Sequence, residues 1–184
     1  MDLIGFLFRW SHVLFGITWI GMLYYFNFIQ GGYFKQASAE GLADAKAKLA
    51  PSALWWFRWG AMGTFITGLA LLGKLAIGLN NYIIVGAIFG TIMFLNVWLI
   101  IWPNQKIALG MAEGDAPAAG AKALLASRHN VLYSAPMAFC MLASGHPDPS
   151  LGWNLYSSMS NSLIVMLVII AALQANAMFG KQGP

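Results

Sequence analysis

The chain has 184 residues, of which 59% are hydrophobic and only 9% are charged, and its formal net charge is +4. Soluble domains average roughly 25% charged residues, so this composition excludes a water-covered globular surface and predicts an all-α integral membrane protein, a single domain over 1–184. The positive charge then reports on topology and not on nucleic-acid binding. Cys140 is the single cysteine and no CxxCH motif is present. A disulfide within the chain and covalent attachment of c-type haem are therefore excluded.

Apolar segments of membrane-spanning length follow one another along the chain. A helix needs ~20 residues to cross ~30 Å of hydrocarbon. The segments predict a bundle of about five transmembrane helices, over residues 4–30, 54–73, 82–102, 130–145 and 156–179. The first has no basic region before it and is too long for the apolar core of a signal peptide. The fourth is short and contains Pro136, so a re-entrant helix is the alternative there.

The connecting segments predict the orientation. Residues 31–53 and 103–129 each carry three Lys or Arg, whereas residues 146–155 carry none. The positive-inside rule then places the N-terminus outside and the C-terminus inside. Both basic segments are rich in alanine, and 37–50 and 111–128 are expected to form short interfacial helices on the cytoplasmic side.

The first predicted span contains two ionisable residues, Arg9 and His12. Helical periodicity places Arg9, His12, Gly16 and Trp19 on one face, together with Gly5. Imidazole is an axial ligand of haem iron, the glycines leave room for a flat macrocycle, and the arginine can pair with a propionate. These residues predict a b-type haem site. The alternative is a buried histidine bonded to a carbonyl oxygen, with Arg9 extending to the headgroups.

Two further histidines are candidates for the second ligand. His146 follows the fourth span at the predicted outer face, at a depth similar to that of His12, whereas His129 opens that span at the inner face. Depth favours a metal site of His12 and His146. The alternative for His146 is a loop residue at the end of a helix without a ligand role. His129 is expected to be an interfacial polar anchor, and the alternative for it is a ligand on the inner side.

Small and polar residues within the predicted spans indicate close helix packing. Gly86-x-x-x-Gly90 lies in the third span, and Gly60, Gly63 and Gly68 lie in the second. Such glycines allow helices to approach closely. Asn96 and Asn161 are expected to form interhelical hydrogen bonds.

Three blocks, RWSHVLFGITWIGMLYYFNFIQ, LWWFRWGAMGTFITGLALL and SRHNVLYSAPMAFCMLASGHPDP, resemble in order and spacing the N-terminal membrane domain of bacterial membrane-bound urate oxidases. The first block also shares a partial pattern with membrane protoporphyrinogen oxidases and copper-resistance membrane proteins. The resemblance implies a component of a membrane oxidoreductase, in the bacterial inner membrane, that passes electrons to cytochrome c. The urate enzymes carry further spans and a cytochrome c domain that this chain lacks, so urate turnover is not carried over.

The leading hypothesis is a b-haem-binding electron-transfer protein or membrane subunit of an oxidoreductase. The alternative is a cofactor-free accessory subunit that packs in the lipid bilayer against a larger membrane complex or a second copy of the chain. A cation-coupled transporter has the least support, because no carboxylate lies inside a predicted span.

Overall fold

The computed structural model describes residues 3–74, 80–145 and 161–180, and every element assigned there is helical. The chain forms α1 (Leu3–Tyr24), η1 (Tyr25–Gln30), α2 (Gly31–Gln36), α3 (Ala39–Asp44), η2 (Ala45–Leu49) and α4 (Ala50–Lys74) in its first half. It continues with α5 (Asn81–Leu95), η3 (Asn96–Ile101), α6 (Trp102–Ala108), α7 (Ala116–Ala143) and α8 (Asn161–Phe179). The segments η1, η2 and η3 are π-helical.

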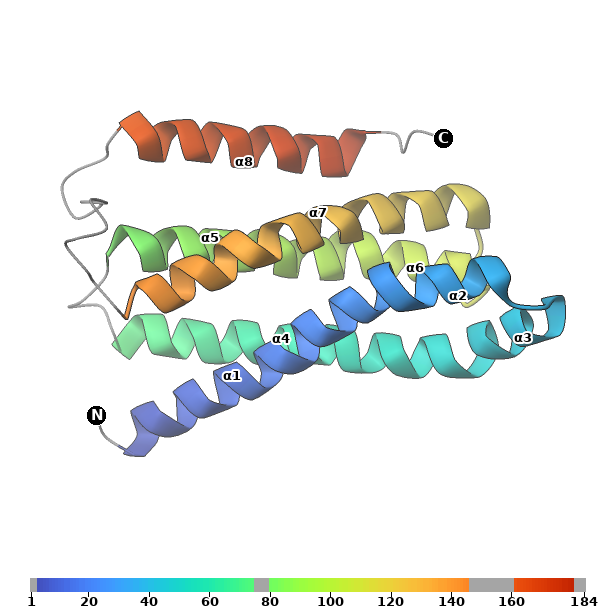
Figure 1. Ribbon diagram of the computed structural model, residues 1–184, viewed down its shortest axis with the longest axis horizontal. Coiled ribbons are helices and arrows are strands. Elements are labelled where there is room, and N and C mark those ends of the chain that lie inside the picture. The colour runs from blue at the N-terminus through green and yellow to red at the C-terminus, as the bar shows by residue number, and fades with distance from the viewer. Residues whose placement is uncertain (1–2, 75–79, 146–160, 181–184) are drawn as a thin grey trace.

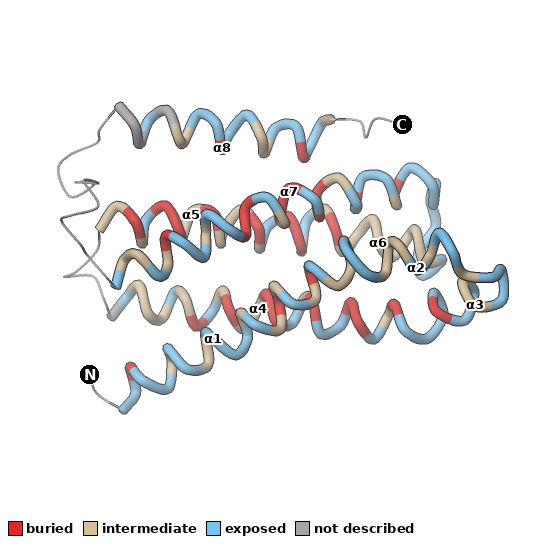
Figure 2. Tube along the Cα trace, viewed as in Figure 1, coloured by how far each residue is buried: buried red, intermediate tan, exposed pale blue. Residues whose placement is uncertain are grey.

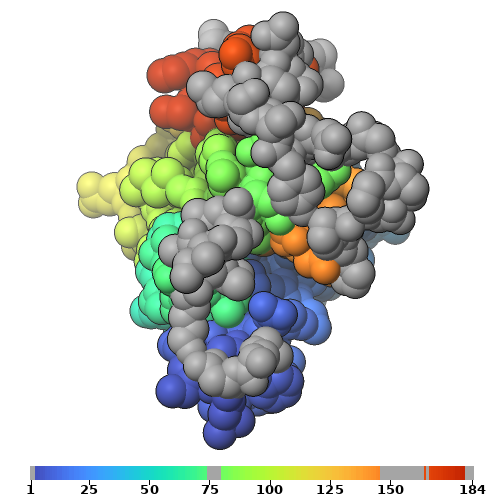
Figure 3. Space-filling view, turned by 90° about the vertical axis from the view of Figure 1, so that its left-hand side faces the viewer, coloured from blue at the N-terminus to red at the C-terminus, as the bar shows by residue number. Residues whose placement is uncertain are grey.

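These elements join into long rods that run side by side and alternate in direction (Figure 1). The first rod is one helix over Leu3–Gln36 and the third is one helix over Asn81–Ala108, because η1 and η3 continue the helices on either side of them. Figure 3 shows the first rod and α8 on opposite sides of the bundle, with the other helices between them.

Side-chain caps and turn glycines fix where the rods begin and turn. Asn80 accepts a hydrogen bond from the backbone N–H of Ile83 at the start of α5, and Asp115 accepts one from Ala118 at the start of α7. Such caps satisfy the first backbone N–H groups of a helix. Gly110 and Gly114 have φ of 73° and 149°, values that favour glycine, in the turn between α6 and α7.

The core lies where α1 packs against α4 and where α5 and η3 pack against α7, while the N-terminal half of α1 and most of α8 are exposed (Figure 2). The glycines expected to allow close packing do so. An added Cβ at Gly60 would lie 3.1 Å from the backbone nitrogen of Trp19 on α1, and one at Gly86 would lie 3.2 Å from the Cβ of Cys140 on α7. The two helix pairs α1–α4 and α5–α7 therefore meet through glycine surfaces.

Two of the rods, Leu3–Gln36 and Asn81–Ala108, are long and apolar enough to cross a membrane, which fits a membrane location. The described part of α8 that is apolar, Met166–Phe179, is shorter. Among the described residues, α4 and α7 do not meet the same criterion of length and composition. The bundle of five transmembrane helices is thus supported only as an all-helical architecture with two candidate spans.

The interfacial helix expected over 111–128 is not a separate helix. Residues 116–143 form one continuous 28-residue helix, so the Ala-rich segment expected as a separate interfacial helix over 111–128 is mostly the first half of α7. Alanine has the highest helix propensity, and the helix passes through Pro136 without ending. The other alanine-rich segment, 37–50, is not a separate helix either, because α3, η2 and α4 follow one another in helical conformation from Ala39 to Lys74.

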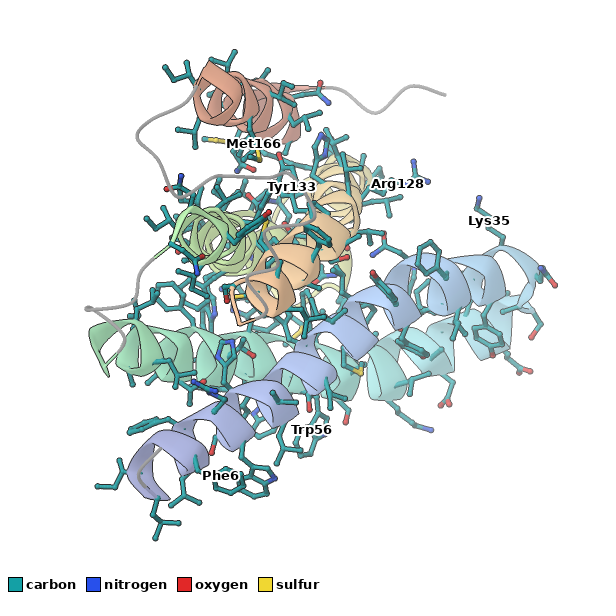
Figure 4. All side chains as sticks on the ribbon, turned by 60° about the vertical axis from the view of Figure 1, so that its left-hand side comes forward. Phe6, Lys35, Trp56, Arg128, Tyr133 and Met166 are labelled. Carbon is teal, nitrogen blue, oxygen red and sulfur yellow. The ribbon has the colours of Figure 1, made fainter. Side chains whose placement is uncertain are left out.

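Basic residues gather at one end of the bundle. Figure 1 shows α2, α3, α6 and the start of α7 together at the end opposite the N-terminus. Figure 4 shows the two ends of the first rod, with Phe6 near the N-terminal end and Lys35 near the opposite end. We call this end, formed by residues 31–53 and 103–128, the basic end.

Candidate functional site

His12 lies on α1 and faces α4. Its Nδ1 is 2.9 Å from the carbonyl oxygen of Thr64 and 3.1 Å from the hydroxyl oxygen of Thr67. A carbonyl oxygen can only accept, so Nδ1 carries the proton and donates it. The hydroxyl of Thr67 donates to the carbonyl of Gly63 at 2.7 Å, and its oxygen is thereby free to accept from the imidazole.

This bonding fixes the tautomer and orientation of the His12 ring. With the proton on Nδ1, the neutral ring has an unprotonated Nε2 with a free lone pair. No hydrogen bond to Nε2 occurs within the described ranges. A histidine that donates its other N–H to a carbonyl oxygen is the usual arrangement of a metal ligand, and the same arrangement would also satisfy a buried histidine with no ligand.

Close contact between α1 and α4 holds the ring in place. A Cβ added at Gly68 would lie 3.1 Å from Cε1 of His12, and one added at Gly63 would lie 2.5 Å from the ring of Phe15. The His12 ring and the Phe15 ring thus occupy space that only glycine leaves on α4. The glycines therefore allow α1 and α4 to approach closely, and Gly68 is the one that packs against the imidazole.

The other predicted residues of the stripe have different surroundings. A Cβ added at Gly16 meets no atom within 4 Å, so the surface one turn from His12 is open. Arg9 is exposed, and no ion pair involves it within the described residues. Trp19 is 1% exposed and belongs to the core, and its Nε1 has no hydrogen-bond partner in the described part of the chain.

His129 is bonded on both sides. It is 8% exposed on α7, its Nδ1 is 2.8 Å from the carbonyl oxygen of Leu125, and its Nε2 is 3.2 Å from Nδ2 of Asn176 on α8. The carbonyl requires the proton on Nδ1, so Nε2 accepts from the amide. His12 contacts α4 and His129 contacts α8, so the hydrogen bonds of these two histidines are made to different helices.

A buried amide cluster lies next to His129. Asn96 on η3 donates to Oδ1 of Asn130 at 2.8 Å and accepts from Nε2 of Gln174 on α8 at 2.6 Å. Asn130 in turn donates to the carbonyl of Met93 at 3.0 Å. The prediction that Asn96 bonds between helices is confirmed. Tyr133, one turn along α7, lies between α5 and α7 (Figure 4), with its ring 5.5 Å from that of Phe89.

Further candidates lie outside the described residues or form no cluster. His146 falls outside them, and so do the side chain of Asn161 and the predicted pairing of His12 with His146. Within 3–74, 80–145 and 161–180 no group of three or more His, Cys, Asp or Glu side chains could hold a metal ion. This finding concerns metal ions whose ligands are all protein side chains. It does not test haem binding, because the protein supplies only the axial ligands of a haem iron.

The sequence reasoning missed the partners of His12. Thr64 and Thr67 lie on α4 beside the three glycines that face α1. The glycine spacing marks the contact face of α4, and a threonine three residues from another on that face is a donor and acceptor available to a facing imidazole. The spacing of these glycines and threonines can be read from the sequence. It points to His12 only when α1 is known to be the helix that faces α4.

A family model described as Urate oxidase N-terminal matches residues 74–183, more than half of the chain. The match runs from the end of α4 through α8 and includes His129 and His146 but not His12. Searches of curated proteins and of solved structures give no match. His12 and its partners Thr64 and Thr67 therefore lie outside the residues that the family model matches.

Proposed function

Because the chain belongs to the urate oxidase N-terminal family, we propose that it is a membrane protein that binds b-type haem through His12 and takes part in electron transfer within an oxidoreductase. The observation that carries the proposal is the fixed tautomer of His12. Its Nδ1 donates to the carbonyl of Thr64 at 2.9 Å, which leaves Nε2 with the lone pair that iron coordination requires.

The residues around His12 fit a macrocycle. Gly16, one turn along α1, has open space where a side chain would begin. Arg9, one turn in the other direction, is exposed and free of ion pairs with other described residues. Gly16 would leave room for the macrocycle, and Arg9 would be available to pair with a propionate. Trp19 would instead hold α1 in the core, since it is 1% exposed.

A bound haem would supply a one-electron redox couple. The chain's own contribution is to position and tune the ligand. The carbonyl of Thr64 and the hydroxyl of Thr67 prevent the His12 ring from rotating. Hydrogen bonding of Nδ1–H also makes Nε2 a stronger electron-pair donor toward a metal ion. The contact of Gly68 with the ring excludes water from that side.

His146 is the proposed second ligand. His129 would have to give up its bond from Asn176 before its Nε2 could bind iron, and that would remove the hydrogen bond between α7 and α8 at this residue. The proposed orientation places the basic end in the cytoplasm and the N-terminus outside. The electron acceptor we propose is a c-type cytochrome, as the resemblance to membrane-bound urate oxidases implies.

The test is the reduced-minus-oxidised visible spectrum of the purified full chain, with a pyridine haemochrome assay for haem content. We expect b-type bands in the native protein, their loss in His12→Ala, and their retention in His129→Ala, the matched control. Circular dichroism and gel filtration check that each variant is folded. Haem-free native protein, or a His12→Ala variant that retains haem at the native level, would contradict the proposal.

One observation favours a second function, a cofactor-free accessory subunit. Large apolar side chains of α1, among them Ile4, Trp10 and Ile17, are 58%, 54% and 65% exposed. Lipid would cover this surface, and so would a larger membrane complex or a second copy of the chain. Haem-free protein that co-purifies with a larger assembly would favour this function over haem binding.

A further inference from the structure

Two cations from different helices contact one indole next to the basic end. The guanidinium carbon of Arg58 on α4 lies 3.9 Å from the ring centroid of Trp102, the first residue of α6, and Nζ of Lys106 lies 5.6 Å from the same centroid. Both distances are within the ~6 Å range of cation–π interactions. Two positive charges from different helices therefore lie at the same indole ring.

No carboxylate neutralises these two charges in the described part of the chain. The ion pair found there joins Lys48 and Asp44, one turn apart on the surface of the α3–η2 segment. Arg58 and Lys106 repel each other, and the repulsion grows as the local dielectric constant falls below that of water. An anion between or beside them would remove that repulsion.

A third polar group, on the same η3–α6 segment, lacks a partner. The indole Nε1 of Trp98, four residues before Trp102, is buried and has no acceptor among the described residues. Its ring lies 5.8 Å from that of Trp59, the residue next to Arg58. Buried N–H groups are nearly always bonded, so a missing acceptor at this position points to a ligand that supplies oxygen atoms.

The surroundings show which kind of anion fits. Trp55, Trp56 and Trp59 on α4 flank Arg58 and are 46%, 57% and 45% exposed. Exposed indoles of this kind gather at the level of the lipid headgroups. The cations are thus placed at headgroup depth, where phosphate groups are concentrated, and basic pockets between helices on the cytoplasmic side bind anionic headgroups.

We propose that Arg58, Lys106, Trp98 and Trp102 form a binding site for the phosphate of an anionic phospholipid. The guanidinium and the ammonium group pair with the phosphate oxygens, and the indole N–H of Trp98 donates to an oxygen of the headgroup or of the ester linkage. The site lies between α4 and the η3–α6 segment. It does not depend on haem binding at His12.

The test measures lipid binding to the purified full chain in non-ionic detergent by native mass spectrometry. The probes are phosphatidylglycerol and phosphatidylcholine with identical acyl chains. We expect preferential binding of phosphatidylglycerol. Arg58→Gln and Lys106→Gln should each weaken that binding about five-fold, which corresponds to about 1 kcal/mol per cation at a membrane surface. Trp98→Phe keeps an aromatic ring and removes the N–H, and it should also weaken binding.

Lys35→Gln and Lys122→Gln are the matched controls. Both residues are exposed cations at the basic end, so each variant loses the same charge from the same end of the bundle, and binding of phosphatidylglycerol should stay near the native level. Equal weakening in the controls would mean diffuse attraction and would overturn the proposal, as would equal binding of the two lipids. Should Arg58→Gln fail to fold, Lys106→Gln against the controls decides.

A second arm distinguishes lipid from a soluble phosphate compound. Glycerol 1-phosphate carries the phosphate and glycerol of the headgroup without acyl chains. We expect it to leave bound phosphatidylglycerol in place at equimolar concentration, because the acyl chains and the exposed indoles contribute to lipid binding. Displacement at equimolar concentration would assign the site to a soluble anion and overturn the lipid assignment.

Discussion

Replacing Gly63 with alanine should loosen the contact between α1 and α4. A Cβ at this position would lie 2.5 Å from Cδ1 and Cγ of Phe15, whereas carbon atoms in contact prefer about 3.5–4.0 Å. The Phe15 ring or the helix must therefore move by about 1 Å. Gly16→Ala adds the same methyl group to a helical glycine of α1, where nothing lies within 4 Å.

The matched pair isolates the packing energy. Alanine gains up to about 1 kcal/mol over glycine in a helix, and this gain is common to both variants. Overpacking a tight contact costs about 1–3 kcal/mol, and only Gly63→Ala incurs it. The difference in the free energy of unfolding between the variants should then be about 1–3 kcal/mol. For a chain of this length it corresponds to roughly 2–12 °C in Tm.

The assay is thermal unfolding in detergent, followed by circular dichroism, with Phe15→Ala as a second-site variant. Gly63→Ala should melt below Gly16→Ala in the Phe15 background, and the gap should close when Phe15 is replaced by alanine, since the clash then has no partner. Equal melting temperatures of Gly63→Ala and Gly16→Ala, or a gap that persists without the Phe15 ring, would refute the reasoning.

Two other predictions concern the core of α7. Asn130→Ala should lower the free energy of unfolding by about 1–3 kcal/mol, because Asn130 is 0% exposed and its loss leaves Asn96 and the carbonyl of Met93 short of a partner. The control Asn104→Ala, which loses a bond within its own helix, should change stability by less than about 0.5 kcal/mol in the same melting assay. Cys140 is buried against Gly86, so a maleimide should label it more slowly in folded than in detergent-denatured protein, by a factor on the order of ten or more. Equal rates would contradict the packing of α5 against α7.

Sequence reasoning was most successful where local chemistry decides. Apolar runs without interruption gave helices, and the glycines of the second and third predicted spans are the surfaces at which helices meet. Asn96 bonds between helices as expected. In each case the property belongs to the residue or its near neighbours: a glycine lacks a side chain wherever the helix packs, and a buried amide must find a partner.

Sequence reasoning was least successful at the boundaries of the rods. The first rod extends to Gln36, six residues beyond the predicted end of the first span, and α7 begins at Ala116, well before the predicted start of the fourth. Hydropathy marks where a helix leaves hydrocarbon, while helix propensity and capping mark where the helix itself ends. The two boundaries coincide only when a helix stops at the interface.

The sequence by itself determined that this protein is helical, suited to a membrane, positively charged at two segments, and equipped with a histidine and an arginine one turn apart on α1. Tertiary structure alone decided what those residues meet. It placed Thr64 and Thr67 against His12 and so fixed the proton on Nδ1, gave Asn176 to His129, and set Arg58 and Lys106 on the ring of Trp102. The reason is physical: periodicity specifies which residues share a face of one helix, but the partner of that face depends on how separate helices pack.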